Sequence, residues 1–137
     1  MKRNLLILLT FLSLTFISSC KKDSTSPTTY PIAGLWEGTY TFLSQPPLYF
    51  SFTIYPDGTM SYKGLGINNY MFYANGTWTL NGSKLSYRVQ TTNTPNVMIQ
   101  PVQKGSATYS NVGTLTNGVN SDSATGLSGS FSLKRIN

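Results

Sequence analysis

The chain has 137 residues, which is enough for one domain with a modest hydrophobic core. Its single cysteine excludes an internal disulfide framework and a cysteine-rich metal site, and the absence of histidine removes the usual general base at neutral pH. The formal net charge is +6, but the basic residues are spread along the chain instead of clustering among aromatic residues, so nucleic-acid binding is not expected.

Residues 1–20 contain the three parts of an export signal. A short basic head precedes an apolar run from Leu5 to Ile17, and two small residues come directly before Cys20. The apolar run is shorter than the roughly 20 residues that a transmembrane helix needs. We therefore predict a cleaved signal peptide rather than a transmembrane anchor.

The tetrad I-S-S-C at residues 17–20 resembles the lipobox of bacterial lipoproteins. The resemblance implies that Cys20 is lipidated and becomes the mature N-terminus, so that acyl chains hold the protein on a membrane without crossing it. Lys21 stands where an aspartate would resemble an inner-membrane retention signal, which favours an envelope protein on the outer membrane. The alternative is an ordinary exported protein with an incidental thiol at Cys20.

Residues 21–31 (KKDSTSPTTYP) are polar, rich in hydroxyl groups and interrupted by proline, which predicts a flexible tether. Lys21 and Lys22 are placed to meet anionic lipid headgroups, although a solvated spacer explains them equally well. Two short D-S-x triplets resemble the O-glycosylation motif of Bacteroidota proteins, which implies candidate glycosylation sites at Ser24 and Ser123.

Residues 32–137 form the expected domain, in which apolar and polar residues alternate in short runs without helical periodicity. Such alternation predicts half-buried β-strands, and the runs are separated by turn signals at Pro56-Asp57-Gly58 and at Asn81-Gly82. Residues 117–125 are expected to form an exposed loop, and residues 98–102 are compatible with either an edge strand or a loop. The expected strands in chain order are residues 36–42, 48–55, 60–62, 70–80, 85–89, 107–109, 113–115 and 127–133.

About eight strands in sequence favour an all-β domain, a small antiparallel up-and-down barrel. A β-sandwich is the alternative, because strand number and alternation do not separate the two. Glycines followed by Ser or Thr recur along the chain and are expected to ease bends in a meander. These glycines are Gly38, Gly58, Gly76, Gly113 and Gly129.

Gly34-Leu35-Trp36, at the start of the first expected strand, resembles the G-x-W motif of the lipocalins. In that family a basic residue near the end of the last strand packs over the tryptophan, and Lys134 or Arg135 would take this place. With its C-K-K-D start and Ser/Thr tether, the chain is similar to small lipocalin-like lipoproteins of Bacteroidota. The resemblance implies a barrel and an envelope location.

The expected domain offers little for catalysis. Its only carboxylates, Glu37, Asp57 and Asp122, are far apart in sequence, and Asp57 belongs to a turn that its side chain can stabilise. The chain has no G-x-S-x-G motif, no phosphate-binding loop and no metal-ligand spacing. We therefore predict a protein that is not an enzyme and needs no cofactor or metal.

Aromatic residues dominate the face that is expected to point inward. A barrel of eight strands is just wide enough to be filled by side chains or to hold one small ligand. For each aromatic residue taken individually, a place in a packed core is the preferred interpretation. A buried tyrosine hydroxyl, however, needs a polar partner, which a ligand can supply. For a ligand site we therefore expect Tyr40, Tyr62, Tyr70 and Tyr87, with Trp36 and Trp78 at its mouth or floor.

Two functions are compatible with this sequence. The first is non-catalytic binding of a small apolar or amphipathic molecule by a lipid-anchored envelope protein. The second is a structural or interaction module on the envelope surface, without a small ligand and with an unknown protein partner. A cavity above roughly 300 Å³ lined by the tyrosines favours the first function, and a filled interior favours the second.

Overall fold

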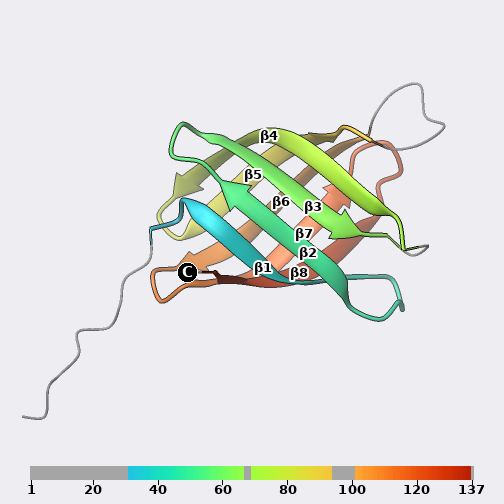
Figure 1. Cartoon of the computed structure of the whole chain (residues 1–137), viewed down its shortest axis with the longest axis horizontal. Helices are drawn as coiled ribbons and strands as arrows, with labels where there is room; N and C mark the ends of the chain where they lie inside the picture. Colours follow the sequence, from blue (N-terminus) through green and yellow to red (C-terminus); the bar gives the residue numbers. More distant parts are fainter. Residues whose placement is uncertain (1–30, 67–68, 94–100, 137) are drawn as a thin grey trace, which may run out of the picture.

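The computed structural model describes residues 31–66, 69–93 and 101–136, and these form a closed barrel of eight antiparallel strands. Each strand pairs with its neighbours in sequence, and β8 closes the barrel by pairing with β1 (Figure 1). This confirms the up-and-down barrel and excludes the sandwich. The strands are β1 (Gly34–Phe42), β2 (Leu48–Ile54), β3 (Thr59–Leu65), β4 (Met71–Asn81), β5 (Lys84–Thr91), β6 (Val102–Ser110), β7 (Thr114–Asp122) and β8 (Ser128–Arg135).

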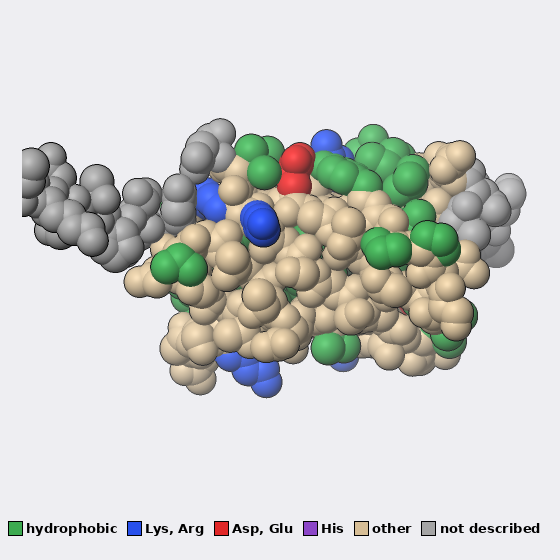
Figure 2. Space-filling model, turned by 90° about the horizontal axis from the view of Figure 1, so that it is seen from below, with side chains coloured by type: hydrophobic (Ala, Val, Ile, Leu, Met, Phe, Trp, Pro, Cys, Tyr) green, Lys and Arg blue, Asp and Glu red, His purple; other side chains and the backbone are tan. Residues whose placement is uncertain are grey.

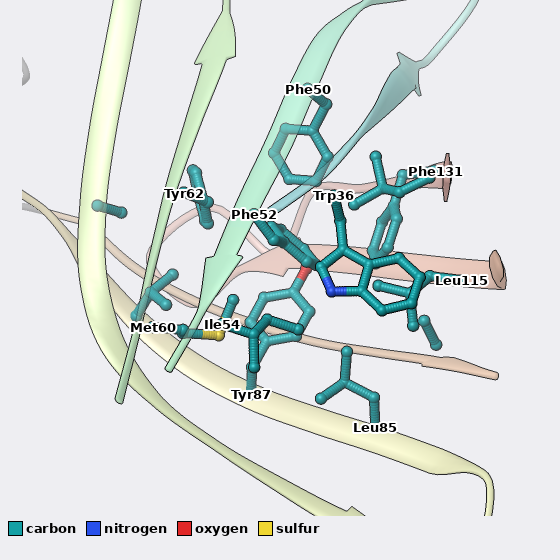
Figure 3. Packing of buried hydrophobic residues seen from close by; sticks show 14 residues of the cluster. Trp36, Phe50, Phe52, Ile54, Met60, Tyr62, Leu85, Tyr87, Leu115 and Phe131 are labelled. Carbon is teal, nitrogen blue, oxygen red and sulfur yellow. The ribbon is translucent and has the colours of Figure 1, made fainter. Parts of the chain in front are cut away.

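The core fills the middle of the barrel and the end at which β1 begins. Phe52 is completely buried, and its ring lies 5.0 Å from Phe50, 5.1 Å from Tyr87 and 5.2 Å from Phe131 between centroids (Figure 3). Trp36 is also fully buried, and its indole Nε1 donates a hydrogen bond to the Ile32 carbonyl. The alternating apolar residues therefore form one contiguous core, as their period of two predicts.

Arg135 is the basic residue that lies over Trp36. Its guanidinium carbon is 5.8 Å from the centre of the indole, and the group donates hydrogen bonds to the carbonyls of Pro31 and Ala33. Lys134 is exposed on the other face of β8. The contact joins the first and last strands by a cation–π interaction and closes the end of the barrel at which β1 begins.

Among the recurring glycines, Gly38 and Gly76 lie where the backbone of a neighbouring strand approaches too closely for a side chain. A Cβ atom at Gly38 would overlap the carbonyl oxygen of Ser132, and one at Gly76 would overlap that of Arg88. Backbone atoms cannot rotate away from such an overlap as a side chain can. Both glycines therefore allow the strong coiling that closes a small barrel.

The two predicted turns are present. Gly58 and Gly82 both have positive φ values, 85° and 57°, and join β2 to β3 and β4 to β5. In the first turn Asp57 Oδ1 accepts a hydrogen bond from the backbone N–H of Thr59 at 2.9 Å. Asp57 therefore stabilises the turn, as its sequence context predicts.

The expectation of two short strands at 107–109 and 113–115 is wrong, because β6 and β7 each contain nine residues. The expected loop at 117–125 is also wrong for residues 117–122, since β7 continues to Asp122. The register shifts between Leu115 and Gly118, and Asn117 there has a φ of 51°. This bulge moves the inward face by one residue, so the alternation changes phase within the strand.

Several predictions concern residues outside the described part of the chain. The predicted signal peptide, the predicted lipidation site Cys20, most of the predicted tether, the candidate glycosylation site Ser24 and most of the segment 98–102 all fall there. The described part holds no helix with the length and apolar character that a membrane span requires.

Candidate functional site

A cavity of about 520 Å³ lies at the end of the barrel opposite the start of β1. It is lined by the last residues of β1 and β3, the first of β2 and β4, inward residues of β6 and β7, and the β7–β8 loop. The other end is closed by the core around Trp36. The lining residues are Tyr40, Phe42, Leu48, Leu65, Gly66, Tyr70, Phe72, Gln103, Asn120, Asp122, Thr125 and Leu127.

The cavity has two unlike walls. The wall from β1 to β4 is apolar and includes the rings of Tyr40 and Phe42, which are stacked with centroids 6.2 Å apart. The opposite wall is polar, because β6 contributes Gln103 and β7 contributes Asn120 and Asp122. Gln103 pairs directly with Asp122 in the β6–β7 register, so the polar groups are adjacent. The arrangement offers apolar contact on one side and hydrogen bonding on the other.

A hydrogen-bonded network underlies the polar wall. The Tyr87 hydroxyl donates to Asn120 Oδ1 at 3.0 Å, and Asn120 Nδ2 donates to Gln103 Oε1 at 2.6 Å. The Tyr62 hydroxyl donates to the same Gln103 oxygen. Both buried phenols thus have partners within the chain, and the network holds Gln103 and Asn120 in fixed orientations at the cavity surface.

Burial and neighbouring charge raise the pKa values of three tyrosines here. Loss of hydration is the main cause at Tyr62 and Tyr87, whose phenol pKa values rise well above 10.0, and interactions among these phenols add to it. At Tyr40 burial again comes first, and the nearby Asp122 carboxylate raises the pKa further. All three side chains are therefore neutral hydrogen-bonding groups at physiological pH.

The structure brings together only part of the predicted site. Tyr40 and Tyr70 line the cavity, whereas Tyr62 and Tyr87 lie in the core and reach its lining through Gln103 and Asn120. Tyr70 precedes β4 instead of beginning it, and its side chain is 37% exposed.

Trp36 and Trp78 do not line this cavity. Trp36 is fully buried at the opposite end of the barrel. Trp78 Nε1 donates to the carbonyl of Tyr55 at 2.9 Å, next to the β2–β3 turn. The antiparallel strand directions explain both positions, because the start of β1 and the end of β4 lie far from the cavity.

Sequence reasoning missed Gln103, Asn120 and Asp122 as cavity residues. Gln103 precedes the segment of β6 that was recognised as a strand, and the other two lie in the part of β7 that was expected to be a loop. Polar side chains are not expected on the inward face of a strand, and the pairing of β6 with β7 places these three there. The Asn117-Gly118 pair, whose residue types are typical of a turn or a bulge, is the sequence signal that could have indicated a bulged strand reaching the last two.

Ser123 follows β7 and is exposed, which a glycosylation site requires. Its hydroxyl donates a hydrogen bond to the carbonyl of Val102 at 2.7 Å. Modification of this oxygen would therefore replace an existing contact between the β7–β8 loop and β6. Its glycosylation stays a prediction.

The raised tyrosine pKa values predict a loss of stability at alkaline pH. In the unfolded chain the Tyr62 and Tyr87 phenols ionise near pH 10.0, while the folded barrel keeps them protonated to higher pH. Their contribution is therefore complete below about pH 10 and is lost as the pH rises toward the folded values, by up to about 1.4 kcal/mol per pH unit for each tyrosine.

Urea unfolding of the wild type, Tyr62→Phe and Tyr87→Phe between about pH 9 and pH 11 measures this effect. Each variant is expected to lose stability less steeply than the wild type, because one ionising phenol is gone. Lysines titrate in the same range but are common to all three proteins, so they cancel in the comparison. Identical slopes in all three would contradict the assignment.

Comparison of the chain with known protein families, with curated proteins and with solved structures finds no match.

Proposed function

We propose that this protein is a lipid-anchored envelope protein of the outer membrane whose barrel binds a small apolar or amphipathic molecule without catalysing a reaction. The observation that carries the proposal is the cavity at one end of the barrel. Its volume of about 520 Å³ exceeds the threshold of roughly 300 Å³ at which a pocket can take a small organic ligand. Its lining is mostly apolar with a few convergent polar groups, which is typical of such pockets.

The surface around the cavity also supports binding. Leu43, directly after the lining residue Phe42, is 69% exposed, and the lining residue Leu127 is 46% exposed. On the face seen in Figure 2, hydrophobic side chains gather toward the end of the barrel that holds the cavity. An apolar rim favours entry of a molecule with an apolar part.

The position of the cavity is compatible with an anchor at Cys20. The chain enters β1 at Gly34, at the closed end, and the cavity lies at the end of β1 near Phe42. A tether before residue 32 therefore joins the barrel at the end away from the cavity. Lipid attachment at Cys20 would leave the mouth accessible from the side away from the anchor.

The chemistry of the lining supports binding over catalysis. Asp122 is the only carboxylate among the lining residues that the structure describes, and the chain contains no histidine. These described lining residues also include no cysteine or lysine that could act as a nucleophile. The polar groups present can orient a ligand but do not form a nucleophile–base pair.

Native mass spectrometry of residues 24–137, purified without detergent, tests the binding function. The eight strands that the structure describes and their fully buried hydrophobic residues lie between Gly34 and Arg135, so this chain keeps the whole closed barrel. We expect a species heavier than the polypeptide that returns to the polypeptide mass on denaturation. A barrel that stays unliganded after exposure to host lipid extract would favour the second candidate, a surface module that uses its exposed apolar rim to contact another protein.

A further inference from the structure

We infer that the cavity selects an amphiphile with a positively charged amine head, which binds at Asp122 while the apolar part lies against the β1–β4 wall. This inference rests on the proposed binding function and specifies its ligand class. It follows from the charge of the lining, the unused bonding capacity of Asp122 and the aromatic pair beside it.

Among the described residues that line the cavity, Asp122 is the one with a charged side chain, and its charge is negative. Asp122 is half-buried there, and these lining residues include neither Lys nor Arg. Lys104 is next to Gln103 in sequence but is exposed on the outer face of β6, and Lys63 lies outside the barrel with Nζ 5.5 Å from the Tyr49 ring. No cation of the described chain therefore neutralises this carboxylate within the cavity.

The Asp122 side chain is fixed in place with one oxygen unused. Oδ1 accepts hydrogen bonds from the backbone N–H groups of Ala124 at 2.7 Å and Thr125 at 3.0 Å. Oδ2 makes no hydrogen bond or ion pair with any residue in the part of the chain that the structure describes. A carboxylate held by one oxygen can bind a donor with the other and loses little side-chain entropy in doing so.

Aromatic rings supply the second part of a cation site. Tyr40 lines the same cavity, and the negative charge of Asp122 contributes to its raised pKa, which indicates that the two groups are close enough to interact. Tyr40 is stacked with Phe42, and the negative faces of aromatic rings attract cations. A carboxylate beside aromatic rings therefore favours an ammonium group with attached carbon chains.

The same arrangement disfavours anionic amphiphiles such as fatty acids. A ligand carboxylate near Asp122 would bring two negative charges together in a partly desolvated space that has no basic side chain among its described lining residues. A neutral alcohol avoids this repulsion but gains no charge attraction. The expected order of affinity is amine, then alcohol, then carboxylate.

Three probes with the same ten-carbon chain test this order: decylamine, decanol and decanoate. An alkylamine resembles the lysine side chain, whose pKa is about 10.4, and is therefore protonated at neutral pH. Isothermal titration of residues 24–137 is expected to show decylammonium binding at least about tenfold tighter than decanol, the gain expected from one charged hydrogen bond. Decanoate is expected to bind more weakly than either.

Asp122→Asn removes the charge while keeping an oxygen for the Ala124 and Thr125 N–H groups. It is expected to weaken decylammonium binding by about tenfold and to weaken decanol binding by less, because the alcohol carries no charge. Asp57→Asn is the matched control, because Asp57 is also a turn aspartate bonded to a backbone N–H but lies outside the cavity. This control should bind all three probes like the wild type.

The outcomes separate the inference from the function on which it rests. If decanol or decanoate binds as tightly as decylammonium, the charge preference is wrong while ligand binding stands. An unchanged decylammonium affinity in Asp122→Asn would also overturn the inference. If none of the three probes binds to the wild type, both the inference and the proposed binding function fail. The comparison of probes on the wild type does not depend on the folding of any variant.

Discussion

Phe52→Ala is expected to lower the free energy of unfolding by about 3–5 kcal/mol, which for a small domain is a large part of its stability. Phe52 is completely buried at the centre of the barrel, and its ring contacts those of Phe50, Tyr87 and Phe131. Removing it leaves a space enclosed by a ring of the same strand and by rings of β5 and β8, and strand pairing prevents this space from collapsing. Urea unfolding followed by tryptophan fluorescence measures the change, since Trp36 lies in the same core.

Phe42→Ala is the matched control for this prediction. The Phe42 ring is only partly buried and already borders the cavity, so its removal enlarges an open space instead of creating an enclosed one. We expect a loss less than half of that for Phe52→Ala, because fewer contacts and less buried area are removed. If both variants lost the same free energy of unfolding, this would contradict a core that is densest around Phe52 and open at the cavity end.

Cys20→Ala is expected to abolish membrane anchoring. The lipobox-like tetrad implies that the acyl chains are attached to this sulfur, and the chain has no second cysteine that could replace it. In the native host, the wild-type protein should be recovered with the membrane fraction, and the variant should lose the lipid-modified N-terminal mass. Retention of Cys20→Ala in washed membranes would contradict a lipid anchor at this residue.

Ser19→Ala provides the control for the anchoring experiment. It keeps a small residue directly before the cysteine and leaves the basic head and the apolar run unchanged. This variant should still be processed, lipidated and recovered with membranes. If both variants leave the membrane fraction, the cause is a general failure of export and not the loss of the acylated sulfur.

The fold was predictable because most strands alternate without interruption. Trp36, Tyr40 and Phe42 share the inner face of β1, and Phe50 and Phe52 continue the pattern in β2. Gly58 and Gly82, at turn positions, indicated the β2–β3 and β4–β5 connections. The sequence was compatible with both a barrel and a β-sandwich. The pairing of β1 with β8 shows that the strands close into a barrel.

The candidate site was less predictable for two physical reasons. The bulge at Asn117 reverses the alternation in β7, so the sequence pattern predicts a loop where Asn120 and Asp122 continue the strand. A ligand could have supplied the partners of the buried Tyr87 and Tyr62 hydroxyls, but Asn120 accepts the hydrogen bond of Tyr87 and Gln103 accepts that of Tyr62. These partners are 33 and 41 residues away in sequence, a separation that local patterns do not encode.

The sequence by itself determined the strand-forming runs, their turns and the aromatic character of the interior, because these depend on residues within a few positions of one another. Only the tertiary structure decided which inward side chains meet. Closure of the barrel places the apolar ends of β1 to β4 opposite the polar residues of β6 and β7, and it fills one end while leaving about 520 Å³ at the other. The cavity and its single carboxylate, Asp122, therefore depend on contacts between strands that are distant in the chain.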